Sequence, residues 1–434
     1  MLDKIVVHGG RRLQGTVHAS GSKNAVLPIL AATLLTEEPC EIRNVPDLSD
    51  VHLMLDILDG LGMRTSFASG TVRTEVADES ISTAPYDLVH QMRASICVLG
   101  PLLAKRKRAQ VAHPGGCVIG TRPIDLHVKG LKALAAELQT VHGYLEGTTV
   151  GLTGAHIFLG GPFGSTVTGT ANVLMAATLA RGTTVIEQAA CEPEVVDLAD
   201  FLTAMGAQIE GAGTPRITVH GVERLGGATH EVIPDRIEAE TFMIASAITC
   251  GDVRIESCRP DQMVAVAEVL RECGASVEAL SAQSVRVRGS RYIKPVDVTT
   301  FAYPGYPTDA QAQIMALMSV ADGISVITDK VYPDRYMHVS EYNRMGAQIR
   351  KNGPTAVVQG VEFLSGAPVK ATDLRASAGL ILAGLAAQGE TEMHQVQHLD
   401  RGYDRIEQKL IQLGAAIERV RYAPRRRKSD RRAA

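Results

Sequence analysis

The chain is 434 residues long, and its 45% hydrophobic and 21% charged residues are typical of a folded globular protein of about two or three domains. Aromatic residues make up only 4% and tryptophan is absent, which argues against stacking on single-stranded nucleic acid. The formal charge of −3 also argues against nucleic acid as a partner. Only residues 424–434 are strongly basic, with six cations and one anion. We expect this tail, residues 423–434, to be a disordered, solvated extension, and a site for an anionic partner is the alternative.

The cysteine pattern and the absence of long apolar runs indicate a cytoplasmic protein. The seven cysteines are odd in number and form no CxxC pair, which is typical of a reduced compartment. No apolar run approaches the ~20 residues that a membrane helix needs. The N-terminal residues also lack the apolar region of a signal peptide. The sequence leaves the oligomeric state open.

A short strand is expected at residues 4–8, followed by six similar segments. Each segment is predicted to contain a buried apolar helix, a β-branched strand, a turn, an amphipathic helix and a final strand. In chain order the segments cover residues 22–66, 93–137, 169–210, 238–278, 309–349 and 375–418, and the second is the loosest. A glycine suited to a left-handed C-cap follows the second helix in five segments, and an alanine takes its place in the second. These positions, 68–73 residues apart, are Gly62, Ala135, Gly206, Gly274, Gly346 and Gly414.

This repeat predicts an α/β fold of two domains. Three segments can pack around three buried helices to form one domain, so six segments form two. We expect an N-terminal domain at residues 22–233 and a C-terminal domain made of residues 1–21 and 234–422. A stacked solenoid is the alternative, but the period of about 70 residues exceeds the roughly 20–50 typical of solenoids.

Ionisable residues stand at the predicted starts of several buried helices: Lys23, Arg93, Asp309 and Arg375. Backbone N–H groups and the helix dipole already favour an anion at such a terminus. A single residue of this kind is more often an ordinary cap or a surface ion pair. Three cations in equivalent places instead predict a site for a strongly anionic substrate, with Asp309 as a lone carboxylate among cations.

The loop HPGGCVIGTRPIDLH at residues 113–127 contains the one cysteine that we expect to be reactive. Cys117 follows Pro-Gly-Gly, and Arg122, His127 and Lys129 are basic neighbours that can lower the pKa of a thiol. The alternative is that these basic residues only solvate a surface. A metal site at His113, Cys117 and His127 is excluded because no second Cys/His pair accompanies them.

Several long segments, in order and over almost the whole chain, resemble the UDP-N-acetylglucosamine 1-carboxyvinyltransferase family. They include SGSKNA, HPGGCVIGTRPIDLH, YPTDAQAQ, TDLRASAGLILAG and HLDRGYDRIEQKL. The resemblance implies two inverse α/β barrels, each built from three βαβαββ units. It also implies transfer of the enolpyruvyl group of phosphoenolpyruvate to the 3-hydroxyl of UDP-N-acetylglucosamine with release of phosphate, the first committed step of peptidoglycan synthesis, without a metal or organic cofactor.

Two other interpretations stay open beside this one. The related 5-enolpyruvylshikimate-3-phosphate synthases share the six-fold repeat but not the PGGC loop. A catalytically silent paralogue that only binds UDP-sugars is the non-enzymatic alternative. The presence of both a candidate acid and a candidate base opposes it, because binding alone requires neither.

The resemblance also assigns roles to single residues. It implies that Cys117 donates a proton to C3 of phosphoenolpyruvate and is the residue alkylated by fosfomycin, and that Asp309 accepts the proton of the 3-hydroxyl. Lys23 and Arg401 would contact phosphoenolpyruvate. The further substrate-binding residues implied are Asn24, Arg93, Arg122, Pro123, Ile124, Asp125, Leu126, Val331 and Arg375. The loop GGPFGS at residues 160–165 lacks the lysine common in the family, so we expect the N–H groups of Gly164 and Ser165 to meet the diphosphate instead.

Overall fold

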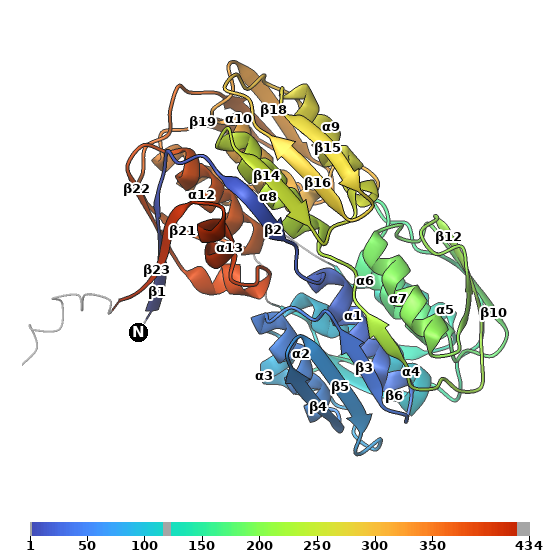
Figure 1. Cartoon of the computed structure of the whole chain (residues 1–434). Helices are drawn as coiled ribbons and strands as arrows, with labels where there is room; N and C mark the ends of the chain where they lie inside the picture. Colours follow the sequence, from blue (N-terminus) through green and yellow to red (C-terminus); the bar gives the residue numbers. More distant parts are fainter. Residues whose placement is uncertain (1, 116–122, 423–434) are drawn as a thin grey trace, which may run out of the picture.

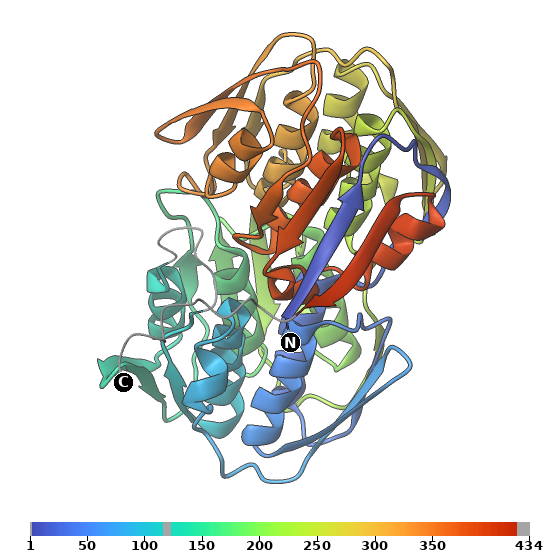
Figure 2. The same cartoon turned by 90° about the vertical axis from the view of Figure 1, so that its left-hand side faces the viewer.

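The computed structural model describes residues 2–115 and 123–422, so Cys117, Arg122 and the basic tail lie outside the described residues. The chain forms two halves that lie against each other (Figures 1 and 2). It passes between them near residues 21 and 234, where Ser22 N donates to Ile233 O at 2.8 Å and Asp235 N donates to Ser20 O at 2.8 Å. The two crossing segments are thus hydrogen-bonded to each other.

The described residues form six small sheets, three in each half, as six repeated units require. The sheets of the N-terminal half, in strand order, are β13 (Thr229–Glu231), β3 (Cys40–Arg43), β5 (Thr71–Val76), β4 (Met63–Ala68); β6 (Arg108–Ala112), β8 (Tyr144–Thr148), β7 (Glu137–Val141); and β11 (Gln208–Glu210), β12 (Arg216–His220), β10 (Thr183–Glu187), β9 (His156–Phe158). The sheets of the C-terminal half are β21 (Pro368–Lys370), β22 (Glu390–His394), β1 (Leu2–His8), β23 (Ala416–Tyr422); β15 (Ser276–Ser281), β16 (Ser284–Arg288), β14 (Asp252–Glu256), β2 (Gln14–His18); and β17 (Val298–Thr300), β18 (Ile324–Asp329), β20 (Thr355–Gln359), β19 (Gln348–Asn352).

The pairing pattern repeats from sheet to sheet. In the five four-stranded sheets, one parallel edge strand joins three antiparallel strands, as where β2 pairs with β14 in the register Thr16↔Arg254. The second unit departs from this pattern, because its first strand is reduced to a single parallel bridge between Thr83 and Gln110. The last sheet is completed by β1 from the chain start, which pairs with both β22 and β23.

Three central helices lie inside each half, and shorter helices accompany the sheets. The central helices are α1 (Lys23–Ala32), α4 (Leu99–Arg106) and α6 (Val167–Ala177) in the N-terminal half, and α8 (Arg236–Ile248), α10 (Gln311–Met318) and α12 (Leu374–Ala386) in the C-terminal half. The others are α2 (Ser49–Gly60), α3 (Tyr86–Val89), α5 (Asp125–Ala133), α7 (Pro193–Ala204), α9 (Val264–Glu272), α11 (Val339–Arg344), α13 (Ile406–Gln412) and the 3₁₀ turns η1 (Thr33–Leu35), η2 (Arg93–Val98), η3 (Pro260–Gln262), η4 (Thr308–Ala310) and η5 (Val396–Arg401).

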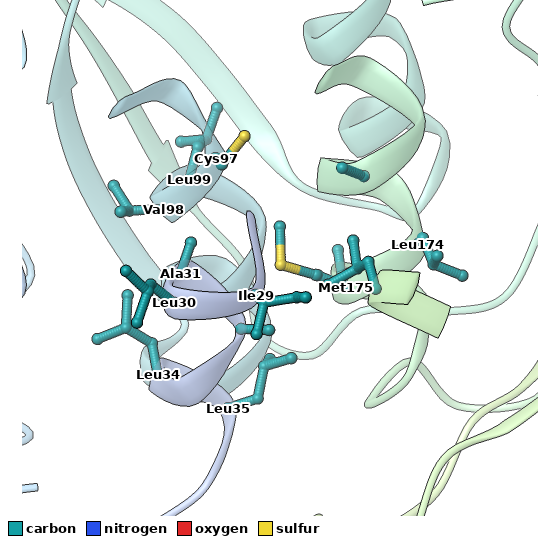
Figure 3. Close-up of a cluster of buried hydrophobic side chains, with 14 of the residues drawn as sticks. Ile29, Leu30, Ala31, Leu34, Leu35, Cys97, Val98, Leu99, Leu174 and Met175 are labelled. Atoms are coloured by element: carbon teal, nitrogen blue, oxygen red, sulfur yellow. The ribbon is translucent and has the colours of Figure 1, made fainter. Parts of the chain in front are cut away.

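The central helices are rich in apolar and small residues, and this composition places them in the interior. Every residue of α8 is buried. Figure 3 shows the equivalent packing in the N-terminal half, where Ile29 of α1 points toward Met175 of α6. Small residues allow the helices to approach closely: a Cβ on Gly379 of α12 would lie 2.2 Å from Tyr342 Oη and 3.1 Å from Ala312 C.

Buried hydrophobic side chains form two separate clusters. One lies within residues 25–233, and the other combines residues 5–19 with residues 239–417. We propose that these cores belong to two domains with the boundaries given above, because each core closes on its own sheets and helices.

The expected C-caps are confirmed. The five glycines that follow the second helix of their segments have φ between 80° and 107°, and Ala135 has φ 68° at the equivalent place. A non-glycine residue in this region is uncommon, so Ala135 shows that the cap geometry is part of the repeated unit.

Candidate active site

The structure places the predicted ionisable residues at or beside helix starts. Lys23 is the first residue of α1, and Arg375 is the second residue of α12. Arg93 begins η2, the turn that leads into α4, and Asp309 lies in η4, the turn before α10. The start of α12 is capped by Asp373, whose carboxylate accepts from Arg375 N at 2.9 Å. This cap fixes the backbone from which the Arg375 side chain extends.

Lys23 of the N-terminal half and Arg401 of the C-terminal half share one carboxylate. Lys23 Nζ lies 2.7 Å from Asp50 Oδ2, and Arg401 Nε lies 2.9 Å from Asp50 Oδ1. The side chains of Asp50 and Lys23 are only 4% and 9% exposed. Burial lowers the pKa of Lys23; Asp50 opposes this effect, and Arg375 and Arg401 add to it. Cations from both halves therefore lie close enough together to affect the pKa of one buried lysine.

Asp309 is surrounded by arginines. Its Oδ1 lies 2.7 Å from Arg335 NH1, and its Oδ2 lies 3.6 Å from Arg375 NH2 and 3.4 Å from Asn24 Nδ2 of the other half. Burial alone would raise the pKa of Asp309, but Arg375 and Arg335 outweigh it and hold that pKa well below its usual range. The carboxylate is therefore ionised, and it needs a change in its surroundings before it can accept a proton at neutral pH.

Arg375 is a buried guanidinium with unused donors. Its side chain is 1% exposed. Among the described residues none of its three nitrogens has a hydrogen-bond partner. Since buried donors are normally satisfied, this group is positioned for an anionic ligand. It lies beside Asp309, so an anion bound here also lies next to the candidate base.

The residues expected to hold the nucleotide sugar lie mainly around the start of α5. Arg93 NH2 donates to Pro123 O at 3.0 Å, and Pro123 leads into α5. Pro123 and Asp125 are exposed and Leu126 is half-buried, as is Ile124, the residue before the helix. A Cβ on Gly161 would lie 3.1 Å from Leu126 Cδ1, so the loop at residues 160–165 packs close to this turn. Val331 lies apart from this group in the C-terminal half, half-buried, and its N–H donates to Asp329 Oδ1 at 3.0 Å.

The loop at residues 160–165 forms a tight turn that uses the amide of Gly164. Gly164 N donates to Gly161 O at 3.1 Å, and Gly161 N donates to Gly164 O at 2.9 Å. The amide of Gly164 is therefore engaged within its own tight turn and is not a free donor for a diphosphate. Gly164 is exposed and has φ 93°, which is why a glycine suits this turn.

Sequence reasoning missed Asp50, Arg335 and Asp373. Asp50 stands in the first turn of α2 and Asp373 is the N-cap of α12. Acidic residues at helix starts are ordinary caps, so the sequence carries no signal that separates these two from the rest. Arg335 has no such position, and only the fold brings its guanidinium to Asp309.

The described cysteines differ from the reactive thiol expected at Cys117. The six described cysteines are free thiols, and burial raises the pKa of both Cys97 and Cys273 to about 12. Such thiols are poor nucleophiles.

Within residues 2–115 and 123–422, no group of three or more His, Cys, Asp or Glu residues is arranged to hold a metal ion. No helix in the described ranges is long and apolar enough to cross a membrane.

Comparison with known proteins decides the family. A family model described as EPSP synthase (3-phosphoshikimate 1-carboxyvinyltransferase) matches residues 7–410. The chain belongs to the enolpyruvyl transferase family. Within that family it is 52% identical over 421 residues to the UDP-N-acetylglucosamine 1-carboxyvinyltransferase of Akkermansia muciniphila, an alignment that covers 96% of this chain and 99% of the relative. It is 53% identical over 419 residues to the protein of the same name from Solidesulfovibrio magneticus, covering 96% and 100%.

Solved structures of family members share the fold. The enolpyruvyl transferase NikO from Streptomyces tendae matches with a TM-score of 0.86 at 25% identity, over 97% of this chain and 100% of that one. EPSP synthase from Acinetobacter baumannii matches with a TM-score of 0.72 at 19% identity over the same shares. The predicted fold class, two inverse α/β barrels built from six repeats, is thereby confirmed.

Proposed function

We propose that this chain transfers the enolpyruvyl group of phosphoenolpyruvate to the 3-hydroxyl of UDP-N-acetylglucosamine, releases phosphate, and so performs the first committed step of peptidoglycan synthesis. The names and the identity of the relatives support this reaction over the shikimate-pathway alternative. The observation in the structure that carries the proposal is Asp309 held between Arg335 and Arg375 of its own half, with Asn24 of the other half 3.4 Å from its Oδ2.

The reaction joins two steps. Attack of the 3-hydroxyl oxygen on C2 of phosphoenolpyruvate forms a C–O bond, while the hydroxyl loses its proton and C3 gains one. Loss of phosphate together with a proton from C3 then restores the C=C bond. The first step needs a base for the hydroxyl, an acid for C3, and cations that stabilise the carboxylate and the phosphate.

Phosphoenolpyruvate carries a phosphate and a carboxylate, and the cations of both halves fit these two groups. Lys23 and Arg401 share Asp50 as a counter-charge. Arg375 brings donors that no described residue uses. An anion bound between these cations would be stabilised in a site largely shielded from water, where such interactions are strongest.

Substrate binding would also activate Asp309. The pKa of Asp309 is held low by Arg375 and Arg335. An anion that accepts hydrogen bonds from Arg375 partly neutralises the positive charge of this arginine. This raises the pKa of the neighbouring carboxyl group of Asp309. Asp309 would therefore become a competent base only when phosphoenolpyruvate is in place, which protects the free enzyme from idle proton transfer.

Cys117 completes the proposal as the acid toward C3. It lies outside the described residues, so its role rests on the resemblance of the loop at residues 113–127. Among the described cysteines, burial raises the pKa of Cys97, Cys258 and Cys273 to about 12, 11 and 12, which makes them unsuited to proton transfer near neutral pH. Fosfomycin should therefore inactivate the enzyme by alkylating Cys117 alone.

The test is phosphate release from phosphoenolpyruvate with UDP-N-acetylglucosamine, with shikimate 3-phosphate, and with neither acceptor. The wild type should release phosphate only with UDP-N-acetylglucosamine, and Cys117→Ala should release much less. Cys191→Ala is a matched control, because Cys191 is one of two described cysteines of intermediate burial and its replacement should not affect turnover. Release only with shikimate 3-phosphate would move the chain to the sister reaction, and no release would favour the binding paralogue.

A cytoplasmic location and small molecules as partners complete the proposal. The free state of the six described cysteines supports a reducing compartment.

The nucleotide sugar would lie between Arg93, the start of α5 and the loop at residues 160–165. Since the amide of Gly164 is engaged, the N–H of Ser165 and the side chains of α5 are left as the contacts for the diphosphate.

A further inference from the structure

Tyr403 lies under the guanidinium of Arg375. Its ring centroid is 5.2 Å from Arg375 Cζ, and the residue is 2% exposed. Tyr403 lies between η5 and α13, two residues after Arg401, and its N–H donates to Leu399 O at 3.1 Å. One short segment therefore carries both Arg401 and the ring that supports Arg375.

The hydroxyl of Tyr403 is held by side chains from two central helices. It lies 3.0 Å from Thr241 Oγ1 of α8 and 3.2 Å from Gln313 Nε2 of α10. Gln313 Nε2 also donates to Thr241 Oγ1 at 3.1 Å. All three side chains are buried. With Arg375 on α12, this network joins the three central helices of the C-terminal half.

The direction of each hydrogen bond follows from the number of available protons. Thr241 Oγ1 donates its single hydrogen to Ile237 O at 2.8 Å, so it can only accept from its other neighbours. Tyr403 must then donate to Thr241. The amide group of Gln313 has two hydrogens, one for Thr241 and one for Tyr403. The hydroxyl of Tyr403 thus donates once and accepts once, and its ring is fixed.

A ring under a guanidinium attracts the cation through its face and leaves the N–H edges free. The three nitrogens of Arg375 have no hydrogen-bond partner among the described residues, and the nearest recorded charge is Asp309 Oδ2 at 3.6 Å. Support by a carboxylate would occupy those donors and neutralise the charge. Support by Tyr403 leaves the positive charge of Arg375 in place, although the hydroxyl of Tyr403 also interacts with the guanidinium.

We infer that Tyr403, fixed by Thr241 and Gln313, is a positioning residue that holds Arg375 by its plane so that its free edge binds the anion of phosphoenolpyruvate. This inference rests on the proposed function. Tyr403 takes no part in proton transfer, because burial raises the pKa of its hydroxyl and the single proton is bonded to Thr241. The phenol acts through the arginine that it supports.

The test compares Tyr403→Phe with Tyr342→Phe. Both tyrosines are buried in the same half, and the hydroxyl of Tyr342 donates to the backbone, to Ala312 O of α10 at 2.8 Å. Each change removes one buried hydroxyl, so both variants should lose similar thermal stability. Tyr403→Phe should raise the KM for phosphoenolpyruvate about tenfold, the effect of a lost hydrogen bond of ordinary strength to a charged site. The KM for UDP-N-acetylglucosamine should change less than about twofold, and Tyr342→Phe should leave both values within about twofold.

A double-mutant cycle shows whether the effect passes through Arg375. In an Arg375→Lys background the lysine has no planar group to stack, so adding Tyr403→Phe should change the KM for phosphoenolpyruvate less than about twofold. Thr241→Val, which keeps the side-chain shape, should reproduce the direction of Tyr403→Phe. Equal KM values for the Tyr403 and Tyr342 variants, or independent effects in the cycle, would overturn the inference.

Direct binding of phosphoenolpyruvate, measured by calorimetry with UDP-N-acetylglucosamine present, separates this inference from the proposed function. If the wild type binds phosphoenolpyruvate but does not turn over, the proposed reaction fails, while the affinity ratio of Tyr403→Phe to wild type still tests the support of Arg375. If the wild type does not bind phosphoenolpyruvate, both proposals are wrong.

Discussion

Replacing Asp50 by asparagine tests whether the contact between the two halves depends on one buried carboxylate. Both oxygens of Asp50 are in use, since Oδ2 lies 2.7 Å from Lys23 Nζ and Oδ1 lies 2.9 Å from Arg401 Nε. An asparagine of the same shape must turn its NH₂ group toward one of these cations, and it no longer carries a charge to balance them. Lys23, whose pKa is already lowered by burial, then lies in the site without the group that opposes this shift.

The expected loss of stability follows from the burial of the pair. Removing one partner of a buried ion pair costs about 3–5 kcal/mol, and we expect the lower end because Arg401 is 21% exposed and partly solvated. For a cooperative unit of roughly 200 residues, about 3 kcal/mol lowers Tm by roughly 6–12 °C. The turnover of Asp50→Asn should fall as well, because Lys23 and Arg401 are expected to bind phosphoenolpyruvate.

Asp47→Asn is the matched control. Asp47 lies three residues before Asp50, ahead of α2, and 3.3 Å from NH2 of Arg405, which is four residues after Arg401. The two side chains are 46% and 60% exposed. Exposed pairs contribute about 1 kcal/mol or less, so Tm should fall by no more than roughly 4 °C. The chain has no tryptophan, so unfolding is best followed by calorimetry or far-UV circular dichroism. Equal shifts of Tm in the two variants would refute the reasoning.

Three further predictions concern a buried carboxyl group, a glycine in a central helix and the C-terminal tail. Burial raises the pKa of Glu240 to about 8, above the unfolded value of about 4.3, so wild-type stability should fall as pH rises between these values. Glu240→Gln should flatten that slope in chemical denaturation at pH 6 and pH 8.5, and an unchanged slope would contradict this assignment. Gly379→Ala places a Cβ 2.2 Å from Tyr342 Oη and should destabilise by about 1–3 kcal/mol. Gly206 has φ 107° and open space around its Cα, so Gly206→Ala should lower the free energy of unfolding by about 1 kcal/mol. A larger stability loss for Gly206→Ala than for Gly379→Ala would count against close helix packing at Gly379. Deleting residues 423–434 should leave turnover unchanged, and a large fall in kcat would give the tail a role.

The family and the reaction could be predicted from the sequence because long segments match in order. The positions of Lys23, Arg93, Asp309 and Arg375 at helix starts could be predicted because they follow from the repeat. The expectation that the amide of Gly164 meets the diphosphate stays a prediction, and the structure adds that this amide donates to Gly161 O within a tight turn. A turn of this kind depends on backbone angles that the letters GGPFGS do not specify.

The sequence by itself determined what depends on local spacing: six repeated units, apolar central helices, left-handed caps after the second helices, and cations at helix starts. These features follow from helix periodicity and from backbone sterics within a few residues. The tertiary structure alone decided which charges share a partner. Asp50 and Arg401 are 351 positions apart in the chain, and Thr241 and Tyr403 are 162 apart, yet each pair is in hydrogen-bond contact. Electrostatic and hydrogen-bond energies depend on distances in space, and between remote elements only packing sets those distances.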